Sequence, residues 1–217
     1  MTTLSADRQP PARLPAAEPT RTVANLVTAV RTALAVALGC AASARGSQEL
    51  LVAAYAAYWA GDVLDGWCAR RLGQETRRGA VFDIVSDRAC TSLLAVVFLS
   101  WNPQMALPVG LFLVQFMVVD CLLTLGFLHW PLLGPNDFHR VDRRLYLLNW
   151  SPPAKALNTA GVVLAVLAGS FWVATAVAVL LLVVKGVSSR RMLRLVAERA
   201  AQVAAPAAPG PAGVARG

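Results

Sequence analysis

Four aspartates in the first half of the chain are the residues best suited to bind a metal: Asp62, Asp65, Asp83 and Asp87. They lie in or beside two long apolar segments. An ionised carboxylate in a bilayer interior costs at least about 2.5 kcal/mol, so four of them need compensation. Carboxylates are hard ligands that suit Mg²⁺ or Mn²⁺. We therefore predict a site for one or two divalent cations.

The spacing of the aspartates assigns them to two helix faces. Positions three, four and seven residues apart share one face of a helix, as do Asp62, Asp65, Gly66 and Ala69. A second face, at intervals of four residues, holds Gly79, Asp83 and Asp87. Because only the short connection 70–78 separates these helices, we expect them to be antiparallel neighbours whose faces meet. Glycines on both faces allow a close approach, and Arg70 at the mouth is placed to meet a phosphate.

Two other interpretations of the aspartates stay open at this point. The carboxylates could pair with Arg31 and Arg88 as buried ion pairs, since charges inside a membrane are commonly paired. They could instead line a path for protons or cations, which would make the chain a cation-binding membrane transport protein. All four acids lie toward one side of the membrane, which counts against a path through it.

The elements that must hold these residues are long and apolar. Of the 217 residues, 57% are hydrophobic and 15% are charged, with a mean hydropathy of +0.55. Soluble domains carry about 25% charged residues, so the composition disfavours a soluble enzyme and excludes disorder for most of the chain. Six segments approach the ~20 residues that a membrane-spanning helix needs: Val23–Ala44, Glu49–Leu72, Gly79–Trp101, Met105–Trp130, Ala154–Gly169 and Trp172–Val196. We predict an all-α polytopic membrane protein with six transmembrane helices. The last two are predicted to be separate helices with a break at Gly169, although a single helix over residues 156–187 is the alternative.

Basic residues are concentrated in the loops on one side of these segments. That side holds, besides residues near the N-terminus, Arg70, Arg71, Arg77, Arg78, Arg140, Arg143, Arg144, Lys155, Arg190, Arg191, Arg194 and Arg199. The opposite loops offer only Arg45. Because cytosolic loops are enriched in Lys and Arg, both termini are predicted to be cytosolic. We therefore expect the basic residues behind the net charge of +8 to face anionic lipid headgroups at the membrane surface, and not to bind nucleic acid.

The two ends of the chain differ in composition from the rest. Residues 1–20 and 202–217 are rich in Pro, Ala and Gly and poor in large apolar residues. Such segments do not bury enough apolar surface to offset the entropy of ordering. We predict disordered tails around one transmembrane catalytic domain at residues 21–201.

The aspartates belong to a longer pattern, Asp62-x2-Asp65-Gly66-x2-Ala69-Arg70-x8-Gly79-x3-Asp83-x3-Asp87. It resembles the signature of the CDP-alcohol phosphatidyltransferase family, with every fixed position present. A second match, Asn25-x2-Thr28-x2-Arg31, is similar to a pattern in that family's first helix. The resemblance implies that the four aspartates bind a pair of Mg²⁺ or Mn²⁺ ions and that Asp87 is the general base. It also implies a set of residues that bind the CDP-linked lipid: Gly66, Ala69, Arg70, Gly79, Asn25 and Thr28.

The same resemblance implies an enzyme of phospholipid synthesis. It would transfer a phosphatidyl group from CDP-diacylglycerol to a small polar alcohol and release CMP, at the cytosolic face of the plasma membrane and as a homodimer. The expected acceptor is a phosphorylated polyol, glycerol 3-phosphate first and inositol phosphate second. The basic residues available to bind its phosphate include Lys155, Arg140, Arg143 and Arg190. A further acid, Asp120, either contributes to the acceptor site or hydrogen-bonds to a neighbouring helix.

Overall fold

The computed structural model describes residues 18–204, which form helices and turns with no strand among them. The first three long segments are single α-helices: α1 (Val23–Arg45), α2 (Gln48–Arg71) and α3 (Arg77–Trp101). The fourth is a continuous rod made of η1 (Pro103–Met105), α4 (Ala106–Val114), η2 (Gln115–Asp120), α5 (Cys121–Leu125) and η3 (Gly126–His129). Within it, η2 is a π-helical stretch.

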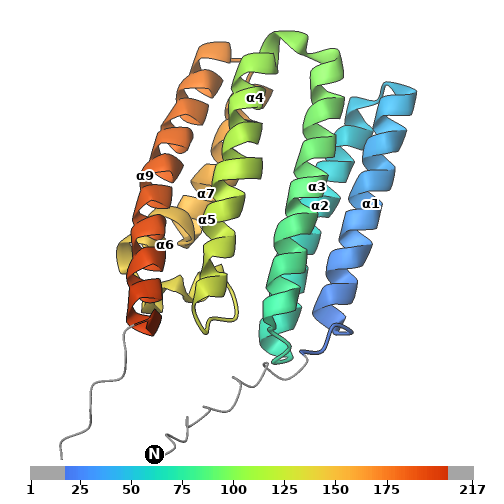
Figure 1. Ribbon diagram of the computed structural model, residues 1–217. Helices are drawn as coiled ribbons and strands as arrows, with labels where there is room; N and C mark the ends of the chain where they lie inside the picture. Colours follow the sequence, from blue (N-terminus) through green and yellow to red (C-terminus); the bar gives the residue numbers. More distant parts are fainter. Residues whose placement is uncertain (1–17, 205–217) are drawn as a thin grey trace, which may run out of the picture.

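The remaining helices lie beside this rod (Figure 1). The connection after it holds η4 (Pro135–Arg140) and α6 (Arg143–Asn149). A fifth rod follows, made of α7 (Pro152–Ala156), the π-helical η5 (Leu157–Gly161) and α8 (Val162–Leu167). The chain then turns through Gly169, whose φ of 70° favours glycine, into α9 (Phe171–Ala204). The predicted break at Gly169 is confirmed.

Short polar side chains set where the first three helices begin. Thr22, Ser47 and Thr76 each accept a hydrogen bond from the backbone N–H three residues ahead, which satisfies one of the free donors at a helix N-terminus. Gly46 adopts a left-handed φ of 62° at the end of α1. These caps fix α1, α2 and α3 as consecutive antiparallel helices.

The helices form two groups, α1–α3 and α4–α9 (Figure 1). In the first group, the buried residues of α1 include Ala24, Ala35, Gly39 and Ala42, whose small size lets helices approach closely. In the second group, an apolar cluster around Phe112 and Phe116 joins α4 to α8 and α9, and another around Phe127 and Phe138 joins η3, η4 and α6 to α9. α3 packs against both clusters, through Ile84 and through Phe98.

Within residues 18–204, three segments are long and apolar enough to cross a membrane: Val23–Arg45, Pro103–His129 and Phe171–Gln202. α2 and α3 carry the charged residues of the aspartate pattern, and the α7–α8 rod is shorter. The start of α1, the turn between α2 and α3, and the end of α9 lie at the same end of the molecule (Figure 1). The tails predicted at 1–20 and 202–217 fall mostly on residues 1–17 and 205–217, which lie outside the described residues.

Candidate active site

The carboxylates of Asp62, Asp83 and Asp87 come together where α2 faces α3. One oxygen from each lies within 4.8 Å of the others. Asp62 extends from α2, and the two others extend from successive turns of α3. The side chains of Asp62 and Asp83 are each 38% exposed, so both remain accessible. Three carboxylate oxygens at this separation form a donor set that fits a hard divalent cation.

Asp65 is held apart from this group and is more deeply buried, with only 6% of its side chain exposed. Its Oδ2 atom accepts a hydrogen bond of 2.7 Å from the Thr28 hydroxyl and another of 2.7 Å from Arg31 Nε. Both donors come from α1, one turn apart. α1 therefore fixes the orientation of the second aspartate of the pattern.

Arg31 contacts all four aspartates of the pattern. Its Nη2 atom lies 2.9 Å from Asp87 Oδ1 and 3.5 Å from Asp62 Oδ1, and it also pairs with Asp83. The interpretation as a buried ion pair is therefore correct for Arg31. One guanidinium against four carboxylates leaves three formal negative charges, so the cluster can still attract cations.

The sequence pattern did not indicate that Arg31 is central or that Gly61 makes room for it. A Cβ atom at Gly61 would collide with the Arg31 side chain. Gly61 precedes Asp62 directly, so a small residue at the start of the aspartate pattern was the available signal.

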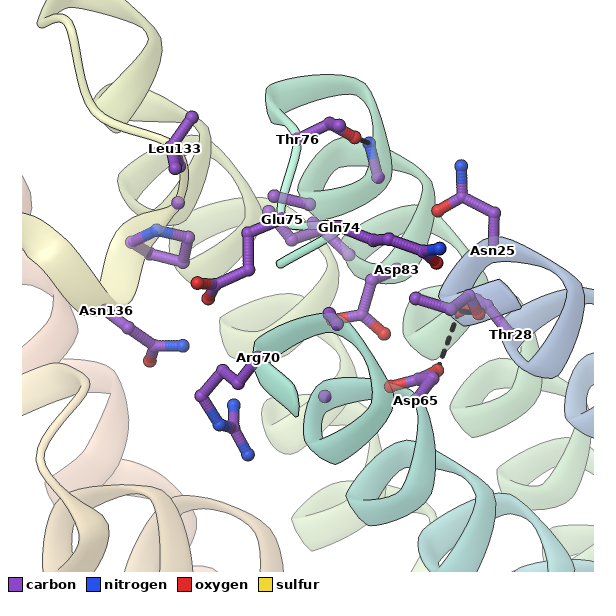
Figure 2. Close-up of a pocket in the computed structure, with 18 of the residues that line it drawn as sticks. Asn25, Thr28, Asp65, Arg70, Gln74, Glu75, Thr76, Asp83, Leu133 and Asn136 are labelled. Atoms are coloured by element: carbon purple, nitrogen blue, oxygen red, sulfur yellow. Dashed lines mark hydrogen bonds between the residues drawn. The ribbon is translucent and has the colours of Figure 1, made fainter. Parts of the chain in front are cut away.

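A pocket of about 170 Å³ opens beside the carboxylates. Figure 2 shows Asn25 and Thr28 on one side of it and Arg70, Glu75 and Asn136 on the other. All six residues predicted to bind the CDP-linked lipid line this pocket: Asn25, Thr28, Gly66, Ala69, Arg70 and Gly79. Asp65 and Asp83 line it as well. The fold thus gathers most of the pattern around one cavity, while Asp62 and Asp87 lie beside it and do not line it.

The structure separates the four basic residues predicted for the acceptor. Lys155 lines the pocket, and its Nζ atom donates a 2.7 Å hydrogen bond to Asn136 Oδ1. Arg140, Arg143 and Arg190 are exposed and do not line it. Arg140 and Arg143 lie in the connection after η3, which folds as η4 and α6, and Arg190 lies on α9.

A neighbouring basic residue, Arg191, has a structural partner. Its Nε atom lies 2.6 Å from Asp142 Oδ2, which ties α9 to the start of α6. Burial tends to raise the pKa of Asp142, but hydrogen bonds from the Leu145 backbone N–H and from Arg191 outweigh it and lower that pKa overall.

Asp120 bonds to neighbouring helices and does not line the pocket. Its two carboxylate oxygens lie 2.6 Å from Arg88 Nη2 and 2.6 Å from Lys185 Nζ. Of the two roles predicted for Asp120, the structure shows the bond between helices. The second predicted ion-pair partner of the aspartate pattern, Arg88, is bound here instead. Sequence analysis missed Lys185, although a lysine inside an apolar segment is itself a signal.

Comparison with known proteins agrees with this arrangement. The family model described as CDP-alcohol phosphatidyltransferase matches residues 21–135, more than half of the chain. The chain belongs to this family. The matched region contains α1, α2, α3 and the following rod, and therefore all of the clustered aspartates.

Two curated relatives are similar to the chain over short segments. A probable CDP-diacylglycerol–inositol 3-phosphatidyltransferase 2 of Arabidopsis thaliana is 50% identical over 36 residues, 17% of this chain and 16% of that protein. A CDP-diacylglycerol–inositol 3-phosphatidyltransferase of Schizosaccharomyces pombe is 44% identical over 46 residues, 21% of this chain and 19% of that protein. The matches thus span less than a fifth of either relative. No solved structure matches the chain.

Proposed function

We propose that the protein transfers a phosphatidyl group from CDP-diacylglycerol to a small polar alcohol and releases CMP. The proposal depends on one observation: the clustered carboxylates lie next to the pocket that the rest of the pattern lines. The carboxylates of Asp62, Asp83 and Asp87 converge beside a pocket, and every other fixed residue of the family's pattern lines that pocket. Family membership supports the reaction class.

Two Mg²⁺ or Mn²⁺ ions would be held by Asp62, Asp65, Asp83 and Asp87. The donor set fits them, because it is made only of carboxylates and retains negative charge beside Arg31. When bound, such ions neutralise a pyrophosphate, polarise the phosphorus and stabilise the leaving CMP. Thr28 and Arg31 donate hydrogen bonds to Asp65 and so fix its orientation. In this way α1 positions one of the proposed metal ligands.

The remaining chemistry is assigned to groups of the chain. The Asp87 carboxylate takes the proton of the acceptor hydroxyl as the new P–O bond forms. The Arg70 guanidinium and the glycines of the pocket bind the CDP moiety. Lys155, which also lines the pocket and is hydrogen-bonded to Asn136, faces the acceptor and suits one that carries a phosphate. The names of the two relatives make inositol a further candidate beside glycerol 3-phosphate and inositol phosphate.

We place the protein in the plasma membrane with six spans and both termini in the cytosol. The three apolar helices and the basic residues at one end of the molecule support this orientation. The pocket lies at that end, between the starts of α1 and α3. A polar alcohol then reaches it from the cytosol while the lipid tails stay in the bilayer. The homodimer implied by the resemblance stays a prediction.

The proposal is tested by CMP release from CDP-diacylglycerol in membranes, with Mg²⁺ or Mn²⁺ and a panel of inositol, inositol phosphate and glycerol 3-phosphate. We expect release with one of these acceptors, and loss of release when EDTA removes the metal. Asp87→Asn should abolish release. Glu49→Gln is the matched control, because it neutralises an exposed acid at the far end of α2 and should retain activity. Full activity of Asp87→Asn would remove the base assignment.

A further inference from the structure

A second group of charged residues is buried next to the aspartate cluster. Arg88, Asp120 and Lys185 are 7%, 5% and 1% exposed. They come from α3, from the end of η2 and from α9. Asp120 uses one carboxylate oxygen for each cation, at 2.6 Å in both contacts. The three side chains, the Arg88 triad, therefore join three helices at one point.

Packing alone does not account for the Arg88 triad. Ionisable residues inside a membrane are expensive and rare, and apolar side chains of similar volume often stabilise a buried site equally well or better. The Arg88 guanidinium lies 3.8 Å from the centre of the Phe116 ring, so an apolar side chain already packs at this place. The buried ion pairs of the Arg88 triad therefore need an explanation other than stability.

The position of Arg88 along α3 supplies that reason. Arg88 directly follows Asp87, and consecutive side chains on an α-helix point about 100° apart. Asp87 points toward α1, where its Oδ1 atom lies 2.9 Å from Arg31 Nη2. Arg88 points toward the second group of helices, where it meets Asp120. A rotation of α3 about its axis would break both contacts together.

Besides the pair with Asp120, α3 contacts the second group of helices through apolar packing and two hydrogen bonds, from Arg77 Nη2 to the Leu128 carbonyl and from Ser92 Oγ to Met117 Sδ. Ile84 packs in the cluster around Phe127, and Phe98 packs in the cluster around Phe112. The Arg88 triad lies between these two regions along α3. Apolar packing is non-directional, whereas an ion pair with a hydrogen bond between Arg88 Nη2 and Asp120 Oδ2 depends on geometry.

We propose that Arg88 is a positioning residue, whose pair with Asp120 fixes the rotation of α3 and holds the Asp87 carboxylate toward the metal and the acceptor. This inference rests on the role that the proposed function gives Asp87. Lys185 has the secondary part of neutralising and holding Asp120. Arg88 does not line the pocket, so its effect reaches the reaction only through Asp87.

Two matched substitutions distinguish the positioning of α3 by Arg88 from the mere loss of a buried positive charge. Arg88→Met leaves Asp120 paired with Lys185, and Lys185→Met leaves Asp120 paired with Arg88. Each removes one buried positive charge and leaves a neutral pair behind. Only Arg88→Met removes the ion pair between α3 and the second group of helices. Arg88→Gln and Lys185→Gln repeat the comparison with polar side chains, so that a folding failure of one methionine variant does not decide it.

The first readout is the steady-state kinetics of CMP release per folded enzyme. We expect Arg88→Met to lower kcat by about 10- to 100-fold, the usual loss when an outer partner of a metal ligand is removed. The KM for CDP-diacylglycerol should stay within about twofold, because the pocket is untouched. Lys185→Met should lose much less. Equal losses in the two variants, or an unchanged kcat in Arg88→Met, would overturn the inference.

The second readout is Mn²⁺ affinity, measured by electron paramagnetic resonance of the free ion. Removing a nearby positive charge by itself strengthens cation binding, whereas a displaced Asp87 weakens it. We expect weaker binding in Arg88→Met than in the wild type, and tighter binding would overturn the inference. If the wild type releases no CMP, the proposed function fails, while the Mn²⁺ comparison still decides the role of Arg88.

Discussion

Arg31 occupies the space between α1, α2 and α3 because residue 61 has no side chain. A Cβ atom at Gly61 would collide with the aliphatic part of Arg31, and interiors do not absorb such overlap without shifts. The spacing of the aspartates predicted that two helix faces meet. It left open whether a metal ion or an arginine, Arg31 or Arg88, lies between them, since that depends on how closely α1 approaches. A pattern within α2 and α3 carries no information about that distance.

Gly61→Ala should therefore weaken both the fold and the site. We expect a loss of about 1–3 kcal/mol in the free energy of unfolding, typical of overpacking, together with reduced CMP release as Arg31 moves away from Asp87. Thermal unfolding in detergent and the CMP assay measure the two effects. Gly110→Ala is the control, because a Cβ there meets nothing within 4 Å and alanine is the better helix former. Equal behaviour of the two variants would show that Arg31 does not need the space at Gly61.

At the scale of elements, hydropathy predicted most of the helices. The six predicted segments agree with the six observed rods within a few residues, apart from the end of α9. Two features had no sequence signal. The π-helical η2 arises inside a uniformly apolar run, where periodicity does not distinguish one helix type from another. The folding of residues 135–149 as η4 and α6 depends on tertiary contacts, such as Phe138 against Trp150.

The N-cap of α3 connects an element to the site. Thr76 accepts a hydrogen bond from the Gly79 N–H, and both residues line the pocket. Thr76→Ala should cost about 1 kcal/mol of stability and should also raise the KM for CDP-diacylglycerol. Ser47→Ala removes the corresponding cap of α2 at the opposite end, so we expect a similar stability loss with an unchanged KM. Thermal unfolding and CMP kinetics on both variants check this, and a shared KM change would contradict the link between cap and pocket.

At the scale of the whole molecule, the distribution of charge sets the orientation in the membrane. Gln48 is the first residue of α2, next to the turn from α1, at the end that is poor in basic residues. Arg71 lies at the end of α2, near the pocket and among basic residues. Because lysines and arginines favour the cytosolic side, the two positions should face opposite sides of the membrane.

A membrane-impermeant maleimide tests this orientation on two exposed positions, Gln48→Cys and Arg71→Cys. The native Cys40 is exposed and is first replaced by serine. We expect the cysteine at position 48 to label in intact cells, and the cysteine at position 71 to label only after permeabilisation. The same α2 helix carries both positions, so labelling from opposite sides would show that this helix crosses the membrane. Labelling of position 71 from outside would reverse the orientation and leave the pocket without access to cytosolic alcohols.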